Sequence, residues 1–238
     1  MTKEVFIVGT SHIAKQSIVT VKKIVEENLP EVVGVELDMS RYRGLVQEQQ
    51  NRARPGLSYI PKIGVKGFIF ALIGSLGMKK LAKYVGTTPG VDMLESINIA
   101  KKNNAKVALI DQNINITLSK FSKNLSKREI GRFFWDLLRG VFNPKGELKR
   151  MGLERFDLST IPTEEIVEKM IQHMKKRYPN VYDVLVYKRN IYMAKKIMRI
   201  MQRDDINKMV VVVGAGHRKG LKEILEVQSS ADFSIKLV

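Results

Sequence analysis

The sequence of 238 residues contains no cysteine and only three histidines. The lack of cysteine excludes disulfide bonds, a cysteine nucleophile, and zinc or iron–sulfur sites with thiolate ligands. Any histidine chemistry must therefore use His12, His173 or His217. No apolar run reaches the roughly 18 residues that a membrane-spanning helix needs, and the first residues lack a signal-peptide pattern. We therefore expect a cytoplasmic protein, with peripheral attachment to a membrane as an alternative.

Acidic residues are scarce, with 24 Asp and Glu against 41 Lys and Arg, and the formal net charge is +17. The excess is regional: residues 41–90 and 175–203 each hold nine basic residues and one acidic residue, so together they carry +16. Neither window has the interleaved aromatics of an RNA-binding pattern or a helix-turn-helix, so we rank nucleic acid lowest among the partners. We expect an electropositive rim that favours an anionic ligand, a peptide carboxylate or an acidic membrane surface.

Short apolar runs rich in branched residues alternate with amphipathic stretches. Four such runs predict buried strands of a parallel sheet, at Val5–Gly9, Val32–Leu37, Lys106–Asp111 and Met209–Gly214, and a final strand is expected at Phe233–Val238. Patterns typical of helices lie at Ile13–Asn28, Met39–Arg52, Pro89–Asn103 and Leu221–Val227. This alternation predicts an α/β fold with a central, mostly parallel sheet and helices on both faces.

Two stretches break the alternation. We predict one domain over residues 1–238 with helical insertions at about 55–90 and 118–203. The second insertion contains three predicted helices, at Lys127–Val141, Thr163–Lys176 and Val181–Arg203. The first contains the apolar segment Gly67–Gly77 with lysines on both sides, a pattern typical of an element that lies on an anionic membrane. We favour the alternative, a lid helix packed on the sheet or across the interface of a homo-oligomer.

Polar residues follow four of the predicted strands at the points where they end. They comprise two G-x-x-H motifs and two carboxylates, namely Gly9 with His12, Gly214 with His217, Glu36 and Asp111. Because the carboxyl ends of parallel strands share one edge of a sheet, we expect these side chains to lie together. Each glycine lets the backbone turn off its strand. The turn then presents an imidazole and backbone N–H groups that could hold an anion or oxyanion.

Glu36 is the carboxylate with the most distinctive position. At the end of a buried strand its carboxylate is desolvated unless it has a partner, and desolvation raises the pKa. A carboxylate with a shifted pKa beside a histidine is typical of general-base and metal sites. Arg41, one turn into the next helix, is expected to partner Glu36 or to bind a substrate carbonyl or carboxylate. Structural roles are alternatives: Glu36 or Asp38 caps the following helix, Asp111 accepts turn N–H groups, and the histidines are solvated.

Five ordered blocks cover essentially the whole chain and resemble those of one family. They are V-G-T-S-H at 8–12, V-E-L-D-x-x-R-Y at 35–42, T-P-G-x-x-M at 88–93, R-N-x-Y-M-A at 189–194 and V-V-G-A-G-H at 212–217. In these blocks the sequence resembles the TraB/PrgY family of pheromone-shutdown proteins. That family is similar to the Tiki proteases, which are metal-dependent and carry two G-x-x-H motifs and a Glu. It is more distantly similar to the erythromycin esterases and to a haem-binding group.

The resemblance implies a functional triad of His12, Glu36 and His217, with Arg41 and Arg189 beside it. The motif residues that it implies as substrate contacts are Gly9, Arg41, Asp111, Arg189, Asn190 and Gly214. Two blocks depart from the family pattern. The D-R-D block reads Asp111-Gln112-Asn113 here, and the D-E that precedes R-N-x-Y-M-A reads Tyr187-Lys188.

The leading hypothesis is a hydrolase of a peptide or ester bond. Either His12, Glu36 and His217 bind a divalent metal (Mn, Co or Zn) with an open position for water, or one histidine is the general base and Glu36 orients it. The sequence leaves both open. A second hypothesis is a protein that sequesters a peptide or small molecule without turnover, and a third is an interaction role at a membrane surface.

Overall fold

The structure is a computed structural model that describes residues 2–10, 15–48, 60–66, 68–69, 90–142, 146, 163–229 and 233–238. His12 lies outside the described residues, as does all of the Gly67–Gly77 segment except residues 68 and 69. The predicted roles of His12 and of that segment therefore stay predictions.

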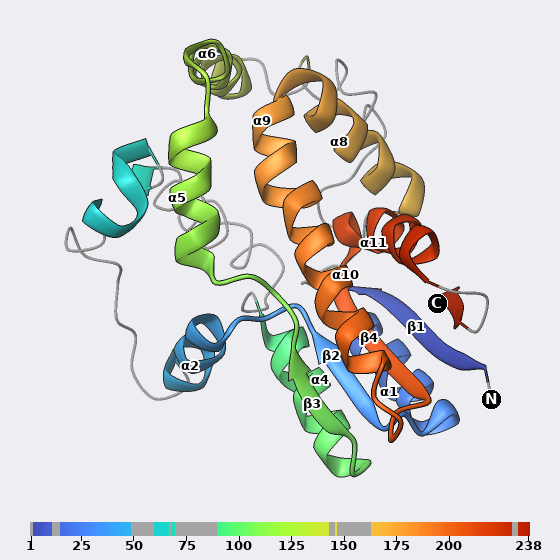
Figure 1. Ribbon diagram of the computed structural model, residues 1–238. Coiled ribbons are helices and arrows are strands. Elements are labelled where there is room, and N and C mark those ends of the chain that lie inside the picture. Colours follow the sequence, from blue (N-terminus) through green and yellow to red (C-terminus); the bar gives the residue numbers. More distant parts are fainter. Residues whose placement is uncertain are drawn as a thin grey trace.

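A five-stranded parallel sheet forms the centre of the fold (Figure 1). Its strands are β1 (Lys3–Thr10), β2 (Val32–Val35), β3 (Lys106–Leu109), β4 (Lys208–Gly214) and β5 (Phe233–Leu237). Their spatial order is β3-β2-β4-β1-β5, and every neighbouring pair is parallel. The register pairs Thr10 with Gly214, so the two strands that precede the G-x-x-H motifs end side by side. The predicted α/β class with a parallel sheet is confirmed.

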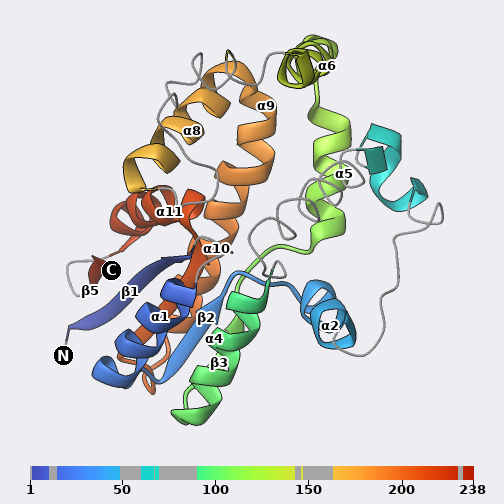
Figure 2. The ribbon, with the colours of Figure 1, turned by 180° about the vertical axis from the view of Figure 1, so that it is seen from behind.

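Helices cover both faces of the sheet, as the sequence predicted. On one face lie α1 (Lys15–Asn28) and α4 (Val91–Lys102), and on the other lie α10 (Lys188–Met201) and α11 (Ala215–Gln228), as Figures 1 and 2 show from opposite sides. Successive strand residues point to opposite faces. Val8 and Val210 therefore pack in the α1–α4 core, whereas Ile7 and Val211 pack in the α10–α11 core with Met193.

The remaining helices stand beyond the carboxyl ends of the strands. They are α2 (Met39–Glu48), α5 (Ile114–Asn124), α6 (Lys127–Phe142), α8 (Glu164–Arg177), α9 (Pro179–Tyr182) and the π-helical segment η2 (Asp183–Tyr187). The single helix predicted at Val181–Arg203 is interrupted by η2, where the Lys188 amide donates to the carbonyl of Asp183, five residues earlier. No helix within the described residues is long and apolar enough to cross a membrane.

Helix α6 is fixed to the α8–α9 junction by its two acidic residues. Ser126 and Glu129 form a capping box, because the Glu129 carboxylate accepts from the Ser126 amide and the Ser126 hydroxyl accepts from the Glu129 amide. The same carboxylate accepts two hydrogen bonds from Asn180. Burial opposes its ionisation, but the hydrogen bonds from Asn180 and Ser126 outweigh burial and lower the pKa of Glu129. Asp136 pairs with Arg177, which completes the anchor.

Candidate functional site

The carboxyl edge of the sheet brings Glu36 and His217 together. Glu36 follows β2, and His217 lies in the first turn of α11 directly after β4. Helix α11 begins at Ala215, earlier than the predicted Leu221, because the G-x-x-H turn is itself helical. Glu36 Oε1 lies 3.4 Å from His217 Nε2, and both residues are buried. The expected convergence of these two side chains is therefore present, while their chemical roles stay predictions.

Arg189 is the centre of this cluster. From the first turn of α10 its Nη2 donates to Glu36 Oε1 and, at 2.6 Å, to Asp111 Oδ2. Its Nε donates to Asp111 Oδ1 at 3.1 Å, and its Nη1 lies 3.0 Å from His217 Nε2. Burial opposes the positive charge, but Glu36 and Asp111 outweigh burial and raise the pKa of Arg189. The guanidinium therefore stays charged and bridges both carboxylates and the imidazole.

The π-helical segment before α10 helps to aim Arg189. In a π-helical turn the backbone bonds run to the fifth residue back, which changes the partners of the local carbonyl groups. The Leu185 carbonyl, within η2, accepts a hydrogen bond from Arg189 Nη1 at 3.1 Å. Arg189 is thus held by backbone and side-chain acceptors at once, which restrains the position of its guanidinium.

Arg41 pairs with Asp111 and not with Glu36. Its Nη1 donates to Asp111 Oδ2 at 3.2 Å, because the first turn of α2 lies within reach of the end of the neighbouring strand β3. The expected partner of Glu36 is therefore replaced by Arg189.

Asp38 caps α2 by accepting from the amides of Ser40 and Arg41, the alternative role that the sequence suggested for it. Asp111 also accepts from the amide of Gln112, so it combines a turn role with its two ion pairs.

Asn190 determines which nitrogen of His217 carries the proton. Asn190 Oδ1 lies 2.6 Å from His217 Nδ1. An amide oxygen only accepts, so Nδ1 donates and the neutral ring has its lone pair on Nε2. That lone pair faces Arg189 Nη1 and lies beside Glu36 Oε1. His217 can therefore act as a base or as a metal ligand through Nε2.

Gly214 and Gly9, the first glycines of the two G-x-x-H motifs, each lie against a side chain at this edge. Gly214 donates its amide to Glu36 Oε2 at 2.7 Å, which joins the ends of β2 and β4. A Cβ atom on Gly9 would lie 2.9 Å from Cδ of Arg218. Gly9 thus allows the Arg218 side chain to lie across the end of β1.

Gly220 offers a test of the Asn190–His217 contact. A Cβ there would lie 2.7 Å from Asn190 Nδ2, which is held in place by the bond to His217. Gly220→Ala is therefore expected to lower the free energy of unfolding by about 1–3 kcal/mol. Gly131→Ala in α6 is the control, because nothing lies within 4 Å of its Cβ position and alanine there should raise that free energy by about 0.5–1 kcal/mol. Urea denaturation measures both, and equal stabilisation by the two changes would contradict the contact.

A pocket of about 410 Å³ adjoins this cluster. It lies between α8, α11 and the start of α10, and both G-x-x-H motifs contribute to its wall through Gly9 and Gly216. Asn190 also lines it. Arg218 and Glu164, paired at 3.0 Å, lie in the wall as well. A ligand in this pocket would therefore lie against Gly9 at the end of β1 and against the turn that carries His217.

The residues that depart from the family blocks serve local structure. Gln112 donates to the hydroxyl of Thr117 at 2.8 Å, and Asn113 caps α5 by accepting from the Asn115 amide. One buried polar residue at this edge was missed by the sequence analysis: Asp92, in the first turn of α4, accepts from the Thr10 hydroxyl at 2.7 Å. Its place in the first turn of the helix, within the T-P-G-x-x-M block, could have indicated it.

The donor atoms of Glu36 and His217 fit a metal site in their separation. Two ligands about 2.1 Å from a tetrahedral metal lie about 3.4 Å apart, which matches the 3.4 Å between Oε1 and Nε2. Among the described residues no group of three or more His, Cys, Asp and Glu could hold a metal ion. The third predicted ligand, His12, is outside those residues, and the guanidinium of Arg189 contacts both donor atoms.

Comparison with known proteins agrees with the motif blocks. Residues 2–236 match the TraB/PrgY/gumN family. The chain belongs to this family. An uncharacterized protein of Methanocaldococcus jannaschii, MJ1365, is 32% identical over 94% of the chain and 53% of its own length. The human and mouse TraB domain-containing proteins are each 23% identical over 92% of the chain and 62% of their own length. The chain therefore spans roughly half to three-fifths of these TraB-family relatives.

Proposed function

We propose that this chain hydrolyses a peptide or ester bond at the edge where Glu36 and His217 meet. The observation that carries the proposal is the position of His217 Nε2, 3.4 Å from Glu36 Oε1 and next to a pocket of about 410 Å³, with Nδ1 bonded to Asn190. A buried imidazole with a fixed tautomer and a carboxylate neighbour is suited to general-base chemistry. The position beyond the carboxyl ends of parallel strands is where α/β proteins bind their ligands.

Three residues of the cluster have separate roles in the proposed reaction: proton transfer, control of the tautomer and stabilisation of the developing charge. His217 Nε2 would take a proton from a water molecule as the water oxygen attacks the carbonyl carbon, and would then return it to the leaving nitrogen or oxygen. Asn190 holds the ring in the required tautomer. Arg189, with Nη1 3.0 Å from the base, would donate to the carbonyl oxygen as negative charge develops on it.

A divalent metal is the alternative to this assignment, because the Nε2 lone pair of His217 would then bind the metal and could not take the proton. His12, Glu36 and His217 would hold the metal, which would supply an activated water and polarise the carbonyl. Manganese, cobalt and zinc all accept nitrogen and oxygen ligands of this kind. Arg189 would then keep its two bonds to Asp111 and give up its contacts with Glu36 and His217.

A second candidate is a protein that sequesters a peptide or small molecule without cleaving it. The observation that favours it is the Arg189 guanidinium, which already contacts Glu36 Oε1 and His217 Nε2. If that contact persists when a ligand is bound in the pocket, Glu36 and His217 stay covered by Arg189 and take no part in chemistry. Ligand would then be held by Arg218 and the backbone of the two motifs.

One assay distinguishes the two candidates. The protein is incubated with mixtures of peptides and carboxylic esters, with and without Mn, Co or Zn salts, and products are identified by mass spectrometry. We expect cleavage that is lost in His12→Ala, Glu36→Ala and His217→Ala and kept in His173→Ala, a histidine of α8 that takes no part in the contacts of Arg189 with Glu36 and His217. Retention of an unmodified component would support sequestration, and cleavage that survives all three substitutions would refute the proposed site.

A further inference from the structure

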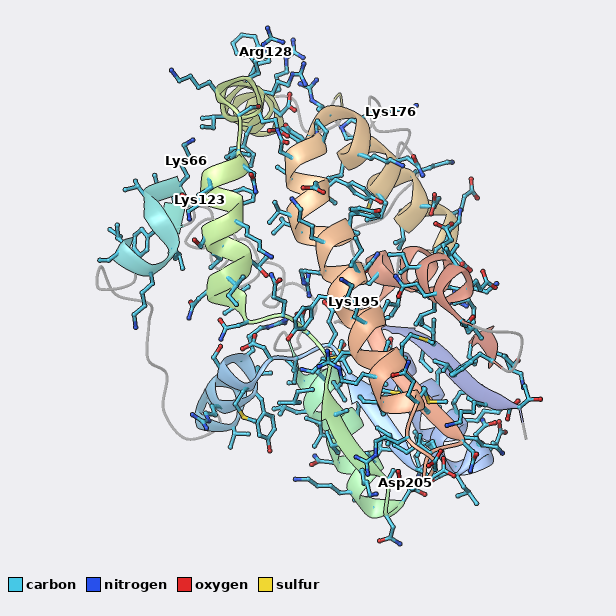
Figure 3. All side chains as sticks on the ribbon, viewed as in Figure 1. Lys66, Lys123, Arg128, Lys176, Lys195 and Asp205 are labelled. Carbon is cyan, nitrogen blue, oxygen red and sulfur yellow. The ribbon has the colours of Figure 1, made fainter. Side chains whose placement is uncertain are left out.

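Basic side chains gather on one end of the molecule, away from the sheet. In Figure 3 the labelled Lys66 and Lys123 lie close together, on the short helix at 60–66 and on α5, and Arg128 lies beyond them at the start of α6. We call the following set the basic face: Lys62, Lys66, Lys120, Lys123, Arg128, Arg132 and Arg139. Its members come from two sequence regions that the fold brings together.

Close packing joins the two regions. Lys66 Nζ donates to the Leu125 carbonyl at 3.2 Å, just after α5. A Cβ on Gly64 would lie 2.4 Å from the Ser122 hydroxyl, so the short helix approaches α5 at a glycine. A shallow pocket of about 380 Å³ runs along this junction, and its lining contains Lys62, Lys120 and Lys123 but no acidic residue.

Four cations of the basic face form no ion pair with a carboxylate of the described residues. Within the described residues no carboxylate oxygen lies within 4.0 Å of Lys66, Lys120, Lys123 or Arg128. The second basic window differs, because four of its members pair with acids: Arg177 with Asp136, Lys188 with Asp183, Arg189 with Glu36 and Asp111, and Arg203 with Asp205. The excess charge is therefore most available to a partner at the basic face.

Exposed apolar side chains share these elements. Val65 and Ile69 are 59% and 47% exposed, Ile116 of α5 is 48% exposed, and Trp135 of α6 is 56% exposed. On α6 the spacing of Arg128, Trp135 and Arg139 places them on one side of the helix. The guanidinium of Arg139 lies over the indole at 5.3 Å. The acidic residues of α6 are held at the α8–α9 junction, so cations and the indole dominate its solvent-exposed side.

We propose that the basic face binds the surface of an anionic lipid bilayer, with Trp135 at the boundary between headgroups and acyl chains. Lysine and arginine side chains are attracted by the negative headgroups, while the exposed aliphatic side chains and the indole gain by leaving water. A nucleic acid would satisfy the cations but would leave Val65, Ile69 and Ile116 in water, so the bilayer fits the observations better. This surface is separate from the Glu36–His217 cluster, and its function does not depend on hydrolysis.

Charge-reversal variants test the binding. Partitioning is measured by co-sedimentation with vesicles of phosphatidylcholine alone and of phosphatidylcholine mixed with phosphatidylglycerol. Lys66→Glu/Lys123→Glu/Arg128→Glu is expected to reduce partitioning onto the anionic vesicles on the order of 100-fold. The matched control is Lys176→Glu/Lys195→Glu/Arg199→Glu, which changes the net charge equally in the second basic window (Figure 3) and should partition close to the parent. Equal losses in both triple variants, or no loss in the first, would overturn the proposal.

Trp135 provides an internal reporter because it is the only tryptophan in the sequence. Its emission is expected to shift to shorter wavelength on anionic vesicles and to be quenched by brominated acyl chains, with no change on phosphatidylcholine alone. Binding without a change in emission would overturn the predicted orientation.

A competition with single-stranded RNA provides the third readout. Displacement of the protein from anionic vesicles by RNA at equal charge would assign the basic face to nucleic acid and contradict the proposal.

Discussion

Arg189→Met is expected to lower the free energy of unfolding by about 3–5 kcal/mol, because it leaves buried carboxylates without their counter-charge. The carboxylates of Glu36 and Asp111 are 5% and 2% exposed, and the guanidinium contacts both. Arg41 would remain as a partner of Asp111, but Glu36 would keep only the backbone amide of Gly214 among the bonds described above. Urea denaturation followed by circular dichroism measures the change.

Lys188→Met is the matched control for that substitution. It removes the adjacent basic residue of the same helix, whose ion pair with Asp183 is about two-fifths exposed on each side. A pair of that kind contributes at most about 1 kcal/mol. The double variant Arg189→Met/Glu36→Gln should lose less than the sum of its single changes, because the two groups interact directly. If Arg189→Met destabilises no more than Lys188→Met, the bridging role assigned to Arg189 is wrong.

His217→Ala is expected to reduce the rate of hydrolysis by about 10²–10⁴-fold, the range that a positioned acid–base group contributes. Glu36→Gln should also reduce the rate, because it removes the carboxylate that contacts Arg189 and lies beside the base. Asn190→Leu removes only the acceptor that fixes the His217 tautomer, so a smaller loss of about 10–100-fold is expected. Steady-state kinetics on a substrate found in the screen measures all three. The loss in Asn190→Leu should appear in kcat more than in KM, because the substitution misplaces the base.

Asn190→Asp tests the reason for that loss. Its carboxylate can still accept from His217 Nδ1, so the rate should recover relative to Asn190→Leu. His173→Ala serves as the control for histidine removal and should match the parent. If Asn190→Asp is as slow as Asn190→Leu, the hydrogen bond to Nδ1 is not what Asn190 contributes.

The sheet and the meeting of Glu36 with His217 were predictable from the sequence. Four apolar runs and the segment Phe233–Val238 were predicted as strands, and five parallel strands are present. Parallel strands share one carboxyl edge, so placing Glu36 and His217 at strand ends was enough to expect them side by side. Similarly, the Ser126–Glu129 spacing is a local signature from which the beginning of α6 can be predicted.

Contacts between distant segments could not be predicted in the same way. Arg189 and Glu36 are 153 positions apart, and the nearer Arg41 was the natural candidate for Glu36. The π-helical turn that helps to hold Arg189 differs from an α-helix in its backbone bonds, which the apolar pattern of the sequence does not report. The sequence indicated the lysines beside Gly67–Gly77 but not the α5–α6 part of the basic face, because Lys66 and Lys123 are adjacent only after the short helix packs on α5.

Hydrolysis in isotopically labelled water tests the central claim most directly. A peptide or ester from the screen is incubated with the parent protein and with His217→Ala, and both products are weighed by mass spectrometry. We predict that the parent releases a carboxylic acid product carrying one labelled oxygen, and that His217→Ala releases almost none in the same time. Equal labelled product from both proteins, or ligand recovered intact from the parent, would contradict a hydrolytic site at Glu36 and His217.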